Sequence, residues 1–66
     1  MTELIISFTN GDGEIHIMAE GSVLNFDELN IEFQDGFVFV HDLDGQVVAY
    51  NASTVRSMVL HYNNKN

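Results

Sequence analysis

The sequence predicts an all-β fold: one small antiparallel meander of five or six strands, barrel-like or strongly coiled. Two observations carry this prediction. Apolar side chains recur with period two in runs rich in β-branched and aromatic residues, and glycine-containing turns separate these runs. Because no internal repeat or second unit interrupts the pattern, we expect a single β domain over residues 1–62 and a frayed polar tail over residues 63–66.

Residues 3–20 are expected to form the first hairpin. Apolar residues alternate on both sides of Asn10-Gly11-Asp12-Gly13, and Asn-Gly and Asp-Gly supply the positive φ angles of tight turns. The expected inward residues are Leu4, Ile6, Phe8, Ile15 and Ile17. The residues expected to point outward from the second strand are Glu14, His16, Met18 and Glu20.

A second hairpin is expected around Asp35-Gly36, and a third pairing around Asp44-Gly45. The expected inward residues before the first of these turns are Leu29, Ile31 and Phe33. Residues 37–40 are apolar on both faces, which is typical of a central strand, and residues 47–50 follow as its partner.

Two segments fit this pattern less directly. Asn25 and Glu28 have the spacing of a capping box, which predicts one helical turn between the hairpins. Residues 53–62 fit either an amphipathic helix, giving an α+β fold, or a turn over residues 51–54 followed by a strand. The β-branched content favours the strand, with Met58, Leu60 and Tyr62 facing inward.

Charge limits the classes of partner. The chain has ten acidic and two basic residues and a net charge of −8. Nucleic acid and anionic membranes are bound through clustered lysine and arginine, so we expect neither as a direct partner. A basic protein surface is the partner that this field favours. The start of the chain lacks a basic, apolar leader, and no apolar run approaches about 20 residues, so we expect a cytoplasmic protein.

Enzymatic motifs are missing, and we expect neither an enzyme nor a metal or cofactor. The chain has no cysteine nucleophile, phosphate-binding loop or zinc-protease pattern. Its carboxylate pairs, Asp42 with Asp44 and Asp27 with Glu28, fall at turns without an apolar wall, as solvated acids do. The three histidines, at positions 16, 41 and 61, fall on three different strands and are expected at the surface.

The remaining acids suggest a binding face. The candidate residues are Asp12, Glu14, Glu20, Asp27, Glu28, Glu32 and Asp35. Carboxylates at strand spacing imitate a row of phosphates, so we expect a non-enzymatic protein-binding module. An inhibitor that occupies the basic surface of a nucleic-acid-handling protein is one form of it. The alternative is a self-assembling structural or accessory subunit without such a partner, whose acids serve solubility alone.

Self-association is expected as well. A chain of this size buries only about 60% of its surface on folding, and without cysteine it has no disulfide to add stability. A second subunit would cover one face of the strand that is apolar on both sides. The candidate self-association residues are Phe37, Val38, Phe39 and Val40, and the expected state is a homo-oligomer.

Overall fold

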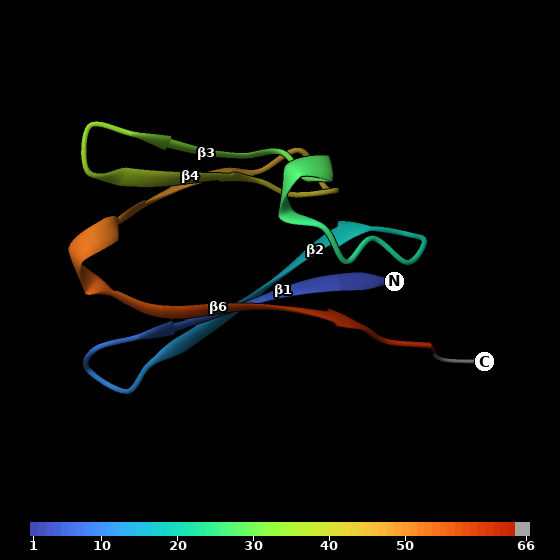
Figure 1. The fold of residues 1–66 in the computed structure, drawn as a ribbon, viewed down its shortest axis with the longest axis horizontal. Helices are drawn as coiled ribbons and strands as arrows, with labels where there is room; N and C mark the ends of the chain where they lie inside the picture. The colour runs from blue at the N-terminus through green and yellow to red at the C-terminus, as the bar shows by residue number, and fades with distance from the viewer. Residues whose placement is uncertain (65–66) are drawn as a thin grey trace.

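The computed structural model describes residues 1–64, which form six strands in two antiparallel sheets (Figure 1). The first sheet has the order β2-β1-β6, with β1 at Thr2–Phe8, β2 at Gly13–Ala19 and β6 at Val55–Tyr62. The second has the order β3-β4-β5, with β3 at Ile31–Gln34, β4 at Phe37–His41 and β5 at Val47–Asn51. The all-β prediction is confirmed.

The sheets lie over one another as two layers, and the prediction of a single meander is wrong. The chain leaves the first sheet after β2, builds the whole second sheet, and returns so that β6 pairs with β1. Across residues 1–64 no strand ladder joins the two sheets, so they do not close into a barrel.

Two single-turn 3₁₀ helices connect these parts. The Asn25 side chain caps η1 (Phe26–Glu28) by accepting a hydrogen bond from the Asp27 N–H, which confirms the predicted helical turn. η2 (Ala52–Thr54) is the turn predicted before the last strand, and it carries the chain from one layer to the other. In the described part of the chain, no helix has the length and apolar character needed to cross a membrane.

The C-terminal segment is a strand, and the alternative of a helix over residues 53–62 is wrong. β6 pairs with β1 from Thr2 opposite Tyr62 to Phe8 opposite Val55, so its backbone groups are used in a ladder. Beyond β6, Asn63 and Met1 exchange hydrogen bonds between their main chains. The last two residues of the expected frayed tail lie outside the described residues.

The core lies between the two sheets. Its buried apolar residues are Leu4, Ile6 and Met18 from the first sheet and Val38 and Val40 from the second. The two valines are 2% and 0% exposed, so they cannot contact a second subunit as predicted. Strand alternation places Phe37 and Phe39 on the outer face of β4, and these two remain the candidates for self-association.

The predicted orientation of β2 is wrong. Ile15 is 61% exposed, whereas His16 and Met18 are buried. The Phe8 N–H donates to the Asp12 carbonyl at 2.9 Å, so a three-residue loop joins the strands and sets Leu4 opposite His16. With a two-residue turn, even-numbered residues of β1 would lie opposite odd-numbered residues of β2, and Ile15 and Ile17 would face inward. The additional loop residue therefore turns every side chain of β2 to the other face of the sheet.

Candidate functional site

The two long sides of the sandwich are built differently. On one side, called here the closed side, β2 faces β5 and the turn between β4 and β5. On the other, called the open side, β3 faces β6 across an apolar cleft. Both sides are candidates for a functional site, because the closed side holds the only buried histidine among the described residues and the open side holds exposed aromatic residues.

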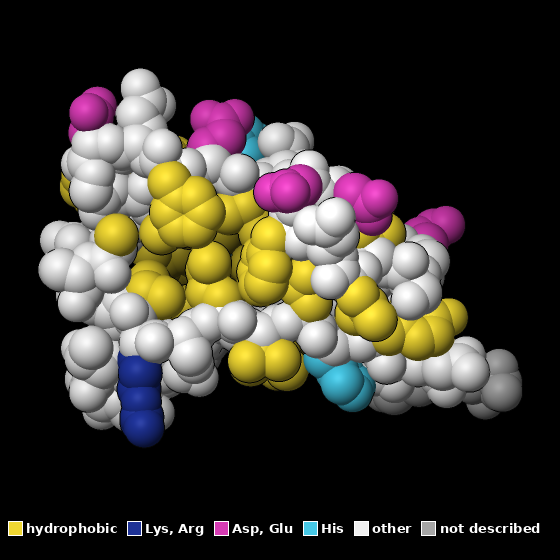
Figure 2. All heavy atoms as spheres, viewed as in Figure 1, with side chains coloured by type: hydrophobic (Ala, Val, Ile, Leu, Met, Phe, Trp, Pro, Cys, Tyr) yellow, Lys and Arg dark blue, Asp and Glu magenta, His cyan; other side chains and the backbone are white. Residues whose placement is uncertain are grey.

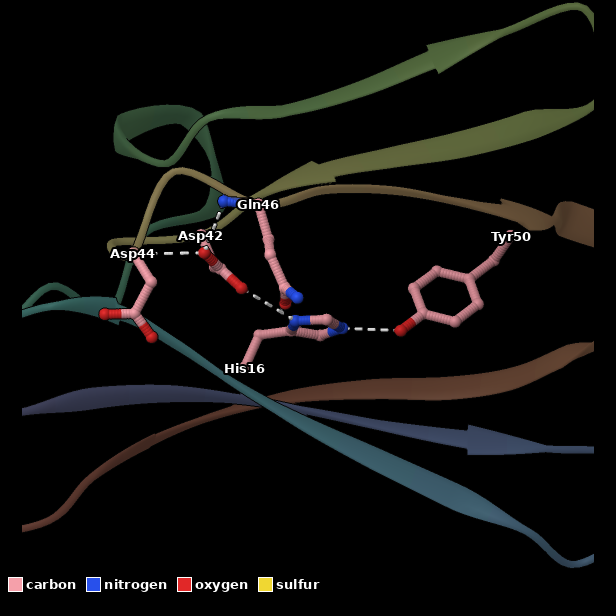
Figure 3. A network of polar contacts seen from close by, with 5 residues as sticks. All are labelled: His16, Asp42, Asp44, Gln46 and Tyr50. Carbon is pink, nitrogen blue, oxygen red and sulfur yellow. Dashed lines mark hydrogen bonds and ion pairs between the residues drawn. The ribbon is translucent and has the colours of Figure 1, made fainter.

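A buried polar network occupies the closed side (Figure 3). His16 is 7% exposed, and its ring lies between Asp42, in the turn after β4, and Tyr50 of β5. Its Nδ1 lies 3.4 Å from Asp42 Oδ2, and its Nε2 lies 2.5 Å from the Tyr50 hydroxyl. Beside this network, the Leu43 N–H donates to the Ile17 carbonyl at 2.8 Å. The network and this main-chain bond therefore hold the two sheets together along one side.

Local turn chemistry positions Asp42. Its Oδ1 accepts hydrogen bonds from the main-chain N–H groups of Asp44 and Gln46, each at 3.0 Å. Gly45 completes the turn with φ 86°, a conformation that glycine adopts without strain. This arrangement leaves Oδ2 of Asp42 directed at His16. The turn signal in the sequence was correct, but the burial of Asp42, whose side chain is 7% exposed, was missed.

The partners of His16 determine which atoms of the network donate hydrogen bonds and which accept them. Burial, then the carboxylates of Glu14 and Asp42, raise the pKa of Tyr50 above its usual range. The phenol therefore keeps its proton at neutral pH and can donate a hydrogen bond to His16 Nε2, while the Asp42 carboxylate accepts a hydrogen bond from the Nδ1–H group. Within residues 1–64 every buried side-chain nitrogen and oxygen has a partner. These contacts describe a structural link between the sheets.

The open side carries a cleft of about 560 Å³ (Figure 2). Its lining residues are Phe26, Asp27, Leu29, Ile31, Phe33 and Met58. Leu29, Ile31, Phe33 and Met58 all face the space between the sheets, as predicted. The cleft leaves this apolar surface partly uncovered. Phe33 is 68% exposed and Phe26 is 41% exposed, although Phe33 lies opposite the buried Val38. The cleft is thus an uncovered continuation of the core.

A hydroxyl in the first strand fixes the segment that forms one end of the cleft. Thr2 is fully buried, and its Oγ1 donates to the Gly21 carbonyl and accepts from the Val23 N–H at 2.8 Å. These two bonds hold the chain between β2 and η1 against the first sheet. Residues Phe26 and Asp27 of η1 then reach the cleft.

All seven predicted acidic residues are exposed, but they do not form a single row. Asp27, Glu28, Glu32 and Asp35 lie on η1, on β3 and in the turn after β3. Asp12, Glu14 and Glu20 lie on or beside β2, in the other sheet. The expected outward strip along β2 is wrong because His16 and Met18 point into the core. Four of the seven therefore surround β3, at the open side.

The other two histidines each lie beside one carboxylate. His41 Nε2 is 3.7 Å from Glu32, and His61 Nδ1 is 3.3 Å from Glu3. Over the described range, no three histidine or acidic side chains come together in a way that could hold a metal ion. Comparison of the chain with protein families, curated proteins and solved structures gave no match.

Proposed function

We propose that this protein is a non-enzymatic binding module that presents the open side of its sandwich to a basic protein. The observation that carries the proposal is the apolar cleft, which remains uncovered in a folded domain and is lined by two exposed phenylalanines and Asp27. Exposed apolar surface bounded by polar residues is characteristic of protein interaction sites. The buried histidine network has satisfied polar atoms and serves as a structural link.

Charge selects the partner. Four acidic residues surround β3, and the chain as a whole carries a charge of −8. Complementary charge speeds association and favours a basic surface over an acidic one. Carboxylates line the upper rim of the apolar hollow in Figure 2. Where the basic surface belongs to a nucleic-acid-handling protein, occupation by this module would inhibit it by taking the place of phosphates.

A capture experiment with matched variants tests this function. The immobilised wild-type protein, Phe33→Ser and Leu43→Ser are each exposed to extract from the source cells at low salt. Both replaced side chains are exposed, but only Phe33 lines the cleft. We expect the wild type and Leu43→Ser to retain the same basic proteins, moderate salt to release them, and Phe33→Ser to lose them. Equal retention by Phe33→Ser would contradict the proposal.

A second candidate function is self-assembly as a structural or accessory subunit. The observation that favours it is the aromatic pair on the outer face of β4, where the ring centroids of Phe37 and Phe39 are 6.3 Å apart and Phe37 is 44% exposed. Val47, on the adjacent strand, is 57% exposed.

Light scattering at micromolar concentration tests this candidate. We expect a mass above the 7.4 kDa of one chain, which Phe37→Ser reduces to that of the monomer. A wild-type protein that stays monomeric would eliminate this function and leave the first untouched.

A further inference from the structure

The free edge of β3 carries main-chain polar groups that have no partner within residues 1–64. Ile31 lies opposite Val40, and the Asn30 carbonyl accepts a hydrogen bond from the His41 N–H. This bond identifies Ile31 and Phe33 as residues of non-hydrogen-bonded pairs, whose N–H and C=O groups point away from β4. β3 is an edge strand with no neighbour on that side among residues 1–64.

Together, Ile31 and Phe33 offer three main-chain hydrogen-bonding groups to an added strand. The Ile31 N–H donates to the Leu29 carbonyl at 3.0 Å, so it is already used. Among residues 1–64, the Ile31 carbonyl and the N–H and C=O groups of Phe33 have no hydrogen-bond partner. A residue placed opposite Phe33 in an added antiparallel strand would exchange two hydrogen bonds with it, and its neighbour two residues away would donate to the Ile31 carbonyl.

The side chains of β3 determine which strand would fit. Ile31 and Phe33 line the cleft, whereas Glu32 and Gln34 alternate onto the outer face. Residues directly opposite one another in a sheet share a face, so those opposite Ile31 and Phe33 would enter the cleft towards Met58 of β6. Those between them would lie beside Glu32. The cleft therefore requires alternation of apolar residues with residues that complement a carboxylate.

The charges around β3 favour basic residues at those outer positions. Asp27 and Glu28 precede β3, Glu32 lies within it, and Asp35 follows it. The other wall is formed by β6, which contains Arg56, the only lysine or arginine among the described residues. A basic segment is therefore attracted to β3, while a second copy of this acidic edge would be repelled by like charges.

From these observations we infer that β3 accepts an extended segment of the partner, in which apolar and basic residues alternate, as a fourth strand of the β3-β4-β5 sheet. The inference rests on the proposed function and names its partner's chemistry and binding mode. Main-chain bonds to Ile31 and Phe33 give affinity, the cleft selects apolar side chains, and the acids select basic ones.

The test uses a seven-residue peptide of alternating lysine and valine, titrated into the isotope-labelled protein and followed by NMR. Two methylated peptides form a matched pair. With valines opposite Ile31 and Phe33, the valine N–H groups point at β3 and the lysine N–H groups point away. Methyl groups on the valine nitrogens therefore remove the bonds that the peptide donates to the Ile31 and Phe33 carbonyls, whereas methyl groups on the lysine nitrogens remove no inter-strand bond. A third peptide, with glutamate in place of lysine, tests the charge requirement.

We expect binding that slows hydrogen exchange at the Phe33 amide at least about tenfold. Methylation of the valine nitrogens should weaken binding at least about tenfold relative to methylation of the lysine nitrogens, and the glutamate peptide should not bind. Equal affinity of the methylated pair, binding without slower exchange at Phe33, or no binding at about 1 mM peptide would each overturn strand addition. Because the capture experiment detects binding at the cleft in any geometry, it can succeed while strand addition fails.

Discussion

The closed and open sides of the sandwich use opposite kinds of contact. On the closed side His16 joins Asp42 and Tyr50 across the layers, and the Leu43 N–H bonds to β2. On the open side the facing strands β3 and β6 leave an apolar cleft. The difference shows that a small domain can fix its two layers along one side with directional polar bonds while the other side stays available.

Directional bonds suit the closed side because they specify one arrangement. A buried histidine without partners would be costly, so the network is satisfied in only one relative placement of the sheets. The apolar side chains at the open side carry no such requirement and can be covered by another chain. In this account the residues of the closed side determine stability and those of the open side determine binding. Substitutions at the closed side should therefore lower the free energy of unfolding, and substitutions at the open side should impair binding.

The largest expected effect comes from Asp42→Ala. The substitution removes the acceptor for His16 and for the N–H groups of Asp44 and Gln46. We expect a loss of about 3 kcal/mol in the free energy of unfolding, measured by urea titration, because charged hydrogen bonds are lost at a buried site. Asp44→Ala keeps its main-chain N–H and should lose less than about 0.5 kcal/mol. Similar stabilities for the two variants would contradict a structural role for the network.

A smaller effect is expected from Tyr50→Phe, which leaves His16 Nε2 without its partner. The free energy of unfolding should fall by about 1–2 kcal/mol in a urea titration.

The stability that Tyr50 contributes should depend on pH. Because the folded state raises the pKa of Tyr50, this contribution is complete below about pH 10 and declines as the pH rises further. Tyr50→Phe should lose this decline, while Tyr62→Phe should keep it. The free energy of unfolding is measured at several alkaline pH values. An equal decline in Tyr50→Phe and in the wild type would refute the assignment of the decline to Tyr50.

The smallest effect on stability is expected at the open side. Phe33 is 68% exposed, so Phe33→Ser should change the free energy of unfolding by less than about 0.5 kcal/mol. A urea titration checks this value. If Phe33→Ser lost as much stability as Asp42→Ala, the cleft would belong to the folded core and its role in binding would lose its basis.

Local features of the fold were predictable from the sequence. Asp35-Gly36 and Asp44-Gly45 turn the chain because Asp35, Gly36 and Gly45 adopt positive φ, and Asn25 caps the predicted helical turn. The chemistry of each turn lies within a few adjacent residues. The strand over residues 55–62 likewise followed from its β-branched content.

Pairing between distant segments was not predictable in this way. β6 pairs with β1 across most of the chain, and this pairing divides the meander into two sheets. The orientation of β2 depends on the loop after Phe8, where one residue more or fewer exchanges the inner and outer faces. His16 therefore looked like a surface residue, although it joins the two sheets. The sequence shows the four acids around β3, but the open cleft beside them depends on how the layers meet.

Native-state hydrogen exchange tests the central claim most directly, because it compares the two sides in one unmodified molecule. The Leu43 amide bridges the sheets at the closed side, and the Phe33 amide points away from β4 at the open side. After correction for intrinsic rates, we predict that Leu43 exchanges at least about 100-fold more slowly than Phe33. Equal protection of the two amides would contradict the account.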